Sequence, residues 1–237
     1  MGDIMSSIVN LPEIKIEYSA SPQQKQLVLI GGGRQPKGSW LQQLVVGRKI
    51  WCIDHGLDIC CQNNLIPELV LGDFDSCQAD SLIWAKKNGA STEQFNSKKD
   101  FTDTQAALTK AKVNNTYTIL TGALGKRFDH TYSTIFSFGH TGNRGCITDE
   151  QETIIFIYPD EEITIIPDFI PKAISLLPIT DTVQGVTTRG LYWELENAEL
   201  RQNAPYAVSN ELIPGEQELH IAICHGILAV YILKDEM

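Results

Sequence analysis

Short apolar runs alternate with segments of helical periodicity over roughly the first 140 residues. Each run is bounded by glycine or polar turn residues, which is typical of buried parallel strands. The intervening segments begin at capping residues, such as the Thr102-x-x-Gln105 capping box, and end near glycines. The pattern predicts strands at 27–30, 49–53, 68–71 and 117–120, and helices at 76–87, 103–113 and 129–138.

The helical periods end near residue 145, and short apolar or alternating runs separated by prolines follow. Strands are predicted at 153–158, 163–166, 173–177, 191–195, 219–224 and 227–233, a series typical of an all-β sandwich or barrel. The expected fold class is therefore α/β, with a mainly parallel sheet flanked by helices at 27–147, followed by an all-β domain at 148–237. Residues 1–26 show no strong period and are predicted to be an N-terminal extension.

Charge and composition narrow the classes of partner. The chain has 19 Lys and Arg residues against 29 Asp and Glu residues, a net charge of −10 without a basic stripe, so nucleic acid is not an expected partner. The longest apolar run, 226–233, is too short to span a membrane. Six cysteines without a C-x-x-C motif indicate reduced thiols and a cytoplasmic protein. An acidic protein can still bind a polyphosphate when a divalent cation mediates.

Two aspartates and a serine follow a predicted buried strand, in the segment Gly72-Asp73-Phe74-Asp75-Ser76. Ligands of parallel sheets bind outside the carboxyl ends of the strands. In extended backbone, Asp73 and Asp75 point the same way and Phe74 points into the fold, so the paired carboxylates suggest Mg²⁺. The alternative is a turn in which Asp side chains form Asx hydrogen bonds.

A second acidic group lies at 98–103, immediately before a predicted helix. Asp103 in the first helical turn is explained by the helix dipole alone, whereas Asp100 has no such need. Lys99 and the lysine before it suit a polyphosphate, although a solvated run of charge is an equal alternative. Thr102 is the predicted cap of the helix.

A glycine-rich connection at 121–130 joins a strand to a helix. Gly122 and Gly125 allow backbone N–H groups to approach an anion, and the helix N-terminus adds favourable partial charge. Lys126 and Arg127 supply cationic donors, and Arg127 has a planar fork that matches phosphate. The spacing is not that of a Walker A loop. Together, the three segments contain the components of metal-assisted phosphoryl transfer.

The β-rich part contains a weaker signal at 190–193 and 208–210. A Trp on a strand is usually part of the core, but Trp193 with the hydroxyl of Ser209 and the amide of Asn210 would also suit a flat heterocycle.

From residue 27 to the end, the sequence resembles the thiamine pyrophosphokinase (thiamine diphosphokinase) family, in its bacterial form. The resemblance is carried by Gly72-Asp73-Phe74-Asp75-Ser76, Lys99-Asp100-Phe101-Thr102-Asp103, the segment Gly122 to His130, Gly190-Leu191-Tyr192-Trp193 and Ser209-Asn210. The family transfers the diphosphate of ATP to the hydroxyl of thiamine, giving thiamine diphosphate and AMP. Its members are homodimers whose active sites combine the α/β domain of one chain with the β domain of the other.

The resemblance implies roles for individual residues. Asp73, Asp75 and Asp100 would hold Mg²⁺ on the triphosphate, Arg127 would bind phosphate, and thiamine would lie against Trp193. The remaining residues expected to bind ATP or the metal are Asp54, Ser76, Lys99, Thr102, Asp103, Gly122, Gly125, Lys126, Asp129 and His130, and those expected near thiamine are Ser209 and Asn210.

One motif departs from the family. The segment Ile53-Asp54-His55-Gly56 stands where members usually have an Ala-Asp-Gly-Gly-like turn, so His55 replaces a residue that allows close approach of the ligand. Two alternative functions remain at this point. A related diphosphokinase acting on a hydroxymethyl pterin would share the aspartates but lack the thiamine-binding half. A sensor of thiamine or nucleotide would bind without catalysis.

Overall fold

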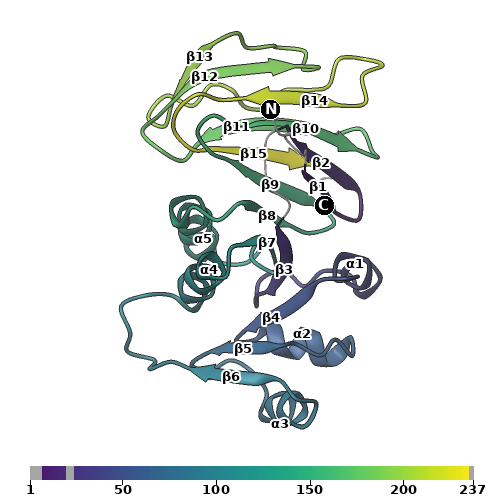
Figure 1. Ribbon diagram of the computed structural model, residues 1–237, viewed down its shortest axis with the longest axis vertical. Coiled ribbons are helices and arrows are strands. Elements are labelled where there is room, and N and C mark those ends of the chain that lie inside the picture. The colour runs from purple at the N-terminus through teal and green to yellow at the C-terminus, as the bar shows by residue number, and fades with distance from the viewer. Residues whose placement is uncertain (1–6, 20–23, 235–237) are drawn as a thin grey trace, which may run out of the picture. The chain divides into compact units, whose positions relative to one another are not determined.

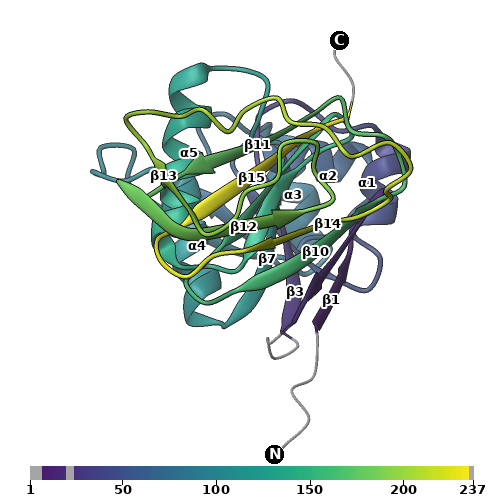
Figure 2. The same ribbon diagram turned by 90° about the horizontal axis from the view of Figure 1, so that it is seen from above.

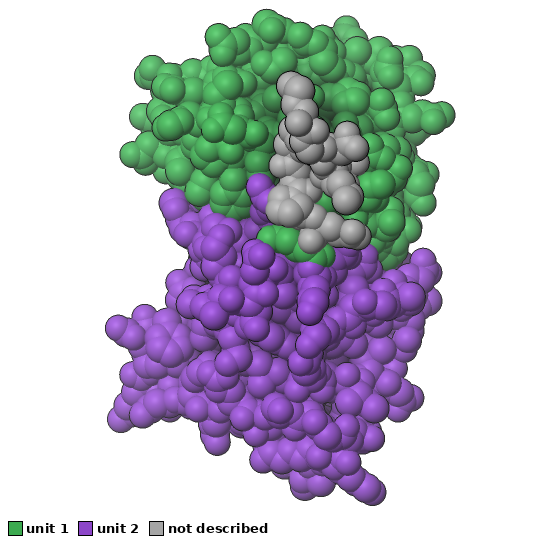
Figure 3. Space-filling model, in the orientation of Figure 1, with its two compact units in different colours: residues 1–24, 151–237 green, residues 25–150 purple. Residues whose placement is uncertain are grey.

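The computed structural model describes residues 7–19 and 24–234. The chain divides into two compact units, which Figure 3 colours separately. Unit 2 is the continuous segment 25–150, and unit 1 combines residues 1–24 with residues 151–237. Within the described residues, no helix is long and apolar enough to cross a membrane.

Unit 2 contains a parallel sheet of six strands, all within residues 25–150, which the structure describes throughout. The order is β8-β7-β3-β4-β5-β6, and every pairing is parallel. The bounds are β3 Lys25–Ile30, β4 Lys49–Ile53, β5 Leu69–Gly72, β6 Ser91–Gln94, β7 Thr116–Thr121 and β8 Gly145–Thr148. The strands at the centre of this sheet are almost wholly apolar and buried, as expected when helices cover both faces.

Helices cover both faces of this sheet. α4 and α5 lie on one face and α1, α2 and α3 on the other (Figures 1 and 2). The bounds are α1 Gly38–Leu44, α2 Gly56–Gln62, α3 Ala79–Lys87, α4 Asp103–Val113 and α5 Phe128–Thr141. The predicted α/β architecture is confirmed.

Caps account for the start of α4 and the end of α5. The capping box predicted for α4 is present, because the Thr102 side chain accepts from the Gln105 backbone and the Gln105 side chain accepts from the Thr102 backbone. α5 passes the predicted stop at Gly139 and ends at Gly142, whose φ of 68° makes it the left-handed C-cap. α3 begins after Gln78 rather than after Ser76. The short elements α1, α2, β6 and β8 were not predicted.

Unit 1 is all β, as predicted, and its described strands pair antiparallel. One sheet has the order β1-β2-β10-β14-β12-β13, and β15 separately pairs with both β9 and β11. The bounds are β9 Glu152–Ile157, β10 Glu162–Pro167, β11 Ala173–Pro178, β12 Thr182–Arg189, β13 Ala198–Arg201, β14 Leu219–Ala222 and β15 Leu228–Leu233.

The predicted N-terminal extension is wrong for the part of it that the structure describes. Ser7–Asn10 forms β1 and Ile14–Tyr18 forms β2, and β2 pairs with β10 through Ile16 and Ile165. The apolar residues of β2 alternate with Lys15 and Glu17, which is the period of a half-buried strand. The segment is short, so its partner strand, far along the chain, decides its structure. Residues 1–6 and 20–23 of the predicted extension lie outside the described residues.

One predicted strand of unit 1 is also wrong. Leu191–Leu195 is an irregular loop whose one β-bridge joins Leu191 to Leu212, and the unpredicted strands β12 and β13 flank it. A shift of register between Val183 and Val186 interrupts the alternation of β12, which hides it in the sequence.

Candidate active site

The candidate site of unit 2 lies at the carboxyl ends of four neighbouring strands. Gly31 follows β3, Asp54 follows β4, Asp73 follows β5 and Gly122 follows β7. A cavity of about 390 Å³ opens at this edge, the side of a parallel sheet on which ligands bind. Of the residues predicted from sequence, it is lined by Asp54, Ser76, Thr102, Asp103, Gly122, Lys126 and His130.

Gly31, Gly32 and Gly33, which follow β3, also line the cavity and were not predicted as site residues. Gly33 N donates to Gly122 O at 2.5 Å, and a Cβ on Gly33 would lie 2.6 Å from the same oxygen. The two loops therefore approach closely only because glycine occupies the position. Lys126 Nζ donates to Gly32 O at 2.8 Å and so fixes the second loop on the first. The signal in the sequence was the glycine run directly after a buried strand.

Asp54 lies at the centre of the strand ends in a strained conformation. Its φ is 46°, and its Oδ1 accepts from Phe74 N at 3.3 Å. A Cβ on Gly72, whose φ is 148°, would overlap this oxygen. Burial, followed by the negative charge of Asp103, raises the pKa of Asp54 to about 7.

Asp73 and Asp75 form a turn rather than the predicted extended segment. Phe74 between them has a φ of 64°, and Asp73 Oδ1 accepts from Asp75 N at 3.2 Å. This hydrogen bond lowers the pKa of Asp73, and the interaction with Asp73 raises the pKa of Asp75. The Asx turn considered as an alternative is therefore present, and it brings the two carboxylates into mutual contact.

Lys99 joins this turn to helix α4. Its Nζ lies 3.0 Å from Asp103 Oδ2 and 3.7 Å from Asp73 Oδ2. The rings of Phe95 and Phe101 flank the ammonium at 5.8 and 6.0 Å from their centroids, and only 9% of the side chain is exposed. Burial lowers the pKa of Lys99, but the hydrogen bond and charge of Asp103 outweigh it and leave that pKa raised. A solvated run of charge, considered above, does not describe Lys99.

Asp103, three residues after Asp100, is linked to Asp73 through the shared ion-pair partner Lys99. Asp100 is exposed, and no hydrogen bond or ion pair described for the chain joins it to Asp73 or Asp75. Asp103 is mostly buried, and its Oδ1 has no hydrogen-bond partner among the described residues. The role of Asp100 stays a prediction, whereas the helix dipole alone does not account for Asp103.

The charged and polar side chains of residues 126–130 fall into two groups. Lys126 and His130 line the cavity, whereas Arg127 and Asp129 pair with each other on the surface at 2.5 Å. The guanidinium lowers the pKa of Asp129 to about 2. Gly125 has a φ of 74°, a turn conformation that favours glycine.

His55, the departure from the family pattern, lines the cavity. Its Nδ1 lies 2.8 Å from Oδ2 of the buried Asp58, and Asp58 Oδ1 accepts from Gln78 N at 3.0 Å. The imidazole therefore has a fixed orientation beside Gly32, where a smaller residue would leave space.

The carboxylates fit a hard divalent cation by their chemistry. Such ions take carboxylate oxygens, and Asp54, Asp73, Asp75 and Asp103 influence one another's charge. The buried Asp103 Oδ1 lacks a partner among the described residues. In the described part of the chain, no three carboxyl, imidazole or thiol groups converge as a complete ligand set.

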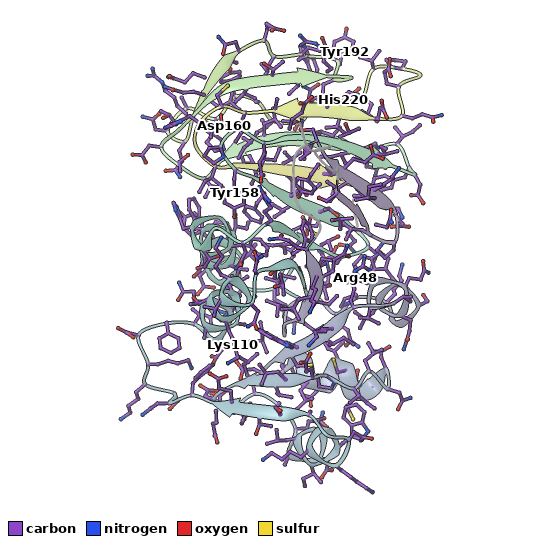
Figure 4. All side chains as sticks on the ribbon, viewed as in Figure 1. Arg48, Lys110, Tyr158, Asp160, Tyr192 and His220 are labelled. Carbon is purple, nitrogen blue, oxygen red and sulfur yellow. The ribbon has the colours of Figure 1, made fainter. Side chains whose placement is uncertain are left out.

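Two adjacent aromatic side chains of unit 1, those of Tyr192 and Trp193, are exposed. Tyr192, labelled in Figure 4, has 63% of its surface accessible and Trp193 has 59%. Their rings meet edge to face at 4.8 Å between centroids. The alternative that Trp193 belongs to the core is therefore wrong. Exposed aromatic faces suit a flat heterocyclic ligand.

Asn210 fixes the loop that carries Trp193. Its Oδ1 accepts from Trp193 N at 3.1 Å and its Nδ2 donates to Trp193 O at 2.8 Å. The side chain is thus occupied by backbone groups. Ser209 beside it has a φ of 58° and is exposed.

Comparison with known proteins decides the family. Residues 42–147 match the model of the thiamin pyrophosphokinase catalytic domain, and residues 160–228 match that of the thiamin pyrophosphokinase vitamin B1 binding domain. The chain belongs to the thiamin pyrophosphokinase family. The two matches together span well over half of the chain and fall one in each unit.

Curated members of the thiamin pyrophosphokinase family are similar at low identity. Thiamine pyrophosphokinase of Bacillus subtilis is 27% identical over 165 residues, covering 68% of this chain and 77% of the relative. Thiamine pyrophosphokinase 1 of Oryza sativa is 25% identical over 154 residues, covering 61% of this chain and 58% of the relative.

Solved structures of the family share the fold. The structure of the Bacillus subtilis enzyme superposes with a TM-score of 0.76 at 23% identity, covering 90% of this chain and all of that one. Thiamin pyrophosphokinase from Candida albicans gives 0.73 at 16% identity, covering 99% of this chain and 100% of that chain.

Proposed function

We propose that the protein transfers the diphosphate group of ATP to the hydroxyl of thiamine, giving thiamine diphosphate and AMP. The observation that carries the proposal is the match of both halves of the chain to the two domains of one family. The match over residues 160–228 favours thiamine over a pterin. The carboxylates around Asp73 and Lys99 favour diphosphate transfer over sensing of thiamine, because recognition of thiamine alone does not require a metal-binding group.

The cavity of unit 2 suits the triphosphate. Lys126 and His130 supply cationic or donor groups, and the first turns of α4 and α5 add favourable partial charge. Asp54, Asp73, Asp75 and Asp103 would hold Mg²⁺, which when bound would neutralise charge on the phosphates. Attack by a primary alcohol on the β-phosphorus then depends mainly on positioning and charge stabilisation.

Incubation of the protein with ATP, Mg²⁺ and thiamine tests this function. We expect equal amounts of AMP and thiamine diphosphate to form, and chromatography measures both products. ADP with thiamine monophosphate, or no product with thiamine but product with a hydroxymethyl pterin, would contradict the proposal. Binding of thiamine without product would support the sensor.

Trp193→Ala is expected to raise the KM for thiamine by about tenfold or more, with a smaller change in kcat. A stacking wall stabilises the ground state and the transition state similarly, so its loss appears mainly in KM. Steady-state kinetics with thiamine as the varied substrate check this. Tyr206→Ala is the matched control, since Tyr206 is an equally exposed aromatic residue of the same unit. An equal loss of kcat in both variants would contradict the assignment.

We also propose a homodimer in which each active site uses the α/β domain of one chain and the β domain of the other. A two-fold dimer would then contain two equal sites. Each variant should be nearly inactive alone when thiamine is well below its raised KM. Refolding an equal mixture of Asp73→Asn and Trp193→Ala/Ser209→Ala chains should then recover roughly a quarter of wild-type activity at that thiamine concentration, because about half of the dimers are mixed and each has one intact site. Mixed dimers proven by mass spectrometry but without recovered activity would exclude a shared site.

A further inference from the structure

Lys99 is the buried cation of a strongly acidic edge of the sheet. Its ammonium lies against carboxylate oxygens of Asp73 and Asp103, which follow β5 and open α4. Asp54 and Asp75 also interact with it electrostatically. With two phenyl rings enclosing the same ammonium, the side chain is directed at the carboxylates and shielded from water.

The loop between β6 and α4 is folded around this arrangement. Phe95 and Phe101 meet edge to face with 5.8 Å between centroids, at the two ends of the loop. Asn96 accepts from the backbone of Lys98 at 2.8 Å and its own carbonyl accepts from Lys99 N at 3.3 Å, forming a turn. Lys98 is exposed, whereas Lys99 is directed inward. The contacts therefore separate the two adjacent lysines into one solvated and one built-in charge.

We propose that Lys99 is a tethered counter-cation that weakens binding of a free divalent metal to the carboxylates, so that the metal binds well only together with the phosphates of the nucleotide. The inference rests on the proposed function, because it assumes that these carboxylates receive a metal with a polyphosphate. A fixed positive charge within a few ångströms of a metal opposes its binding, while the same charge attracts the phosphates that accompany it. Lys99 is thus a positioning and tuning residue rather than a metal ligand.

Binding of Mn²⁺ alone, followed by electron paramagnetic resonance in the absence of nucleotide and thiamine, tests the proposal. Lys99→Met should bind Mn²⁺ at least about fivefold more tightly than the wild type. Lys99→Arg, which keeps the charge, should stay within about twofold of the wild type. Lys98→Met is the matched control, because it makes the same change in net charge at the exposed neighbour, and its affinity should be unchanged.

Unchanged or weaker Mn²⁺ binding in Lys99→Met would overturn the proposal, as would an equal gain in Lys98→Met, which would indicate an effect of net charge. Circular dichroism shows whether Lys99→Met is folded. If it is not, Lys99→Gln replaces it, because glutamine keeps a hydrogen-bond donor for Asp103 while removing the charge. The expected increase in Mn²⁺ affinity is the same. The metal titration is independent of product formation. A wild type that makes thiamine diphosphate without a gain in Lys99→Met refutes only this inference, and a gain without any product refutes only the proposed function.

Discussion

Asp73→Asn is expected to lower the turnover of thiamine diphosphate synthesis by at least about 100-fold, which corresponds to about 2.7 kcal/mol of transition-state stabilisation. Asp73 is placed where it contacts Asp75 N and the Lys99 ammonium. The amide that replaces it keeps the size of the side chain but removes the charge that a metal requires. Steady-state rates at limiting and saturating Mg²⁺ measure the effect.

The fold of this variant should persist, because Asp73 lies in a turn at the end of β5. Asp80→Asn is a matched control, since Asp80 is an exposed carboxylate in the first turn of α3, and its activity should equal that of the wild type. Near-wild-type activity of Asp73→Asn at limiting Mg²⁺ would contradict the assignment. Asp100→Asn and Asp103→Asn, measured in parallel, decide which of these two carboxylates acts with Asp73.

Gly72→Ala is expected to lower the rate of thiamine diphosphate synthesis by at least about 100-fold and to lower the melting temperature of the protein. The new methyl group would overlap the carboxylate of Asp54, in a backbone conformation that side chains rarely adopt. Asp54 would then have to leave its place at the carboxyl end of β4, and with it the hydrogen bond to Phe74 N. Thermal unfolding followed by circular dichroism, together with the product assay, measures both losses.

Gly89→Ala separates backbone strain from the collision. Gly89 also has a positive φ, of 90°, but nothing lies within 4 Å of an added Cβ, so the cost should be about 1 kcal/mol without loss of activity. Adding Asp54→Ala to Gly72→Ala should recover part of the melting temperature but none of the activity. If Gly72→Ala is no worse than Gly89→Ala in either measurement, the contact with Asp54 does not matter.

The sequence pattern predicted correctly those strands and helices that are determined by neighbouring residues in the chain. The strand at 49–53 and the helix at 103–113 have the bounds expected from the sequence, because apolar runs and the capping box act over a few residues. The all-β nature of residues after 150 also follows from short runs separated by prolines. The strands β1 and β2 escaped prediction because a four- or five-residue alternation is too short to define a strand without its partner, and β10 lies far along the chain.

Motifs located the edge of the parallel sheet where the polar groups gather, but they did not define the contacts between those groups. Residue types in the segments at 72–76, 99–103 and 122–130 were sufficient to predict carboxylates and cations at neighbouring strand ends, because all parallel strands end at the same edge. The same motifs did not distinguish Asp100 from Asp103, or Arg127, paired outward with Asp129, from Lys126 in the cavity lining.

By itself, the sequence determined the class of each half, the positions of the chemical groups along the chain and the family that they resemble. The tertiary structure alone decided that Lys99 lies between Asp73 and Asp103, that Gly72 leaves space for Asp54, and that Trp193 is exposed. These contacts join residues on different strands and loops, and their geometry follows from positive φ angles and close packing that residue spacing does not encode. The neutralisation of the carboxylates by Lys99 also depends on the folded sheet, because these residues follow different strands and become neighbours only when the strands pair.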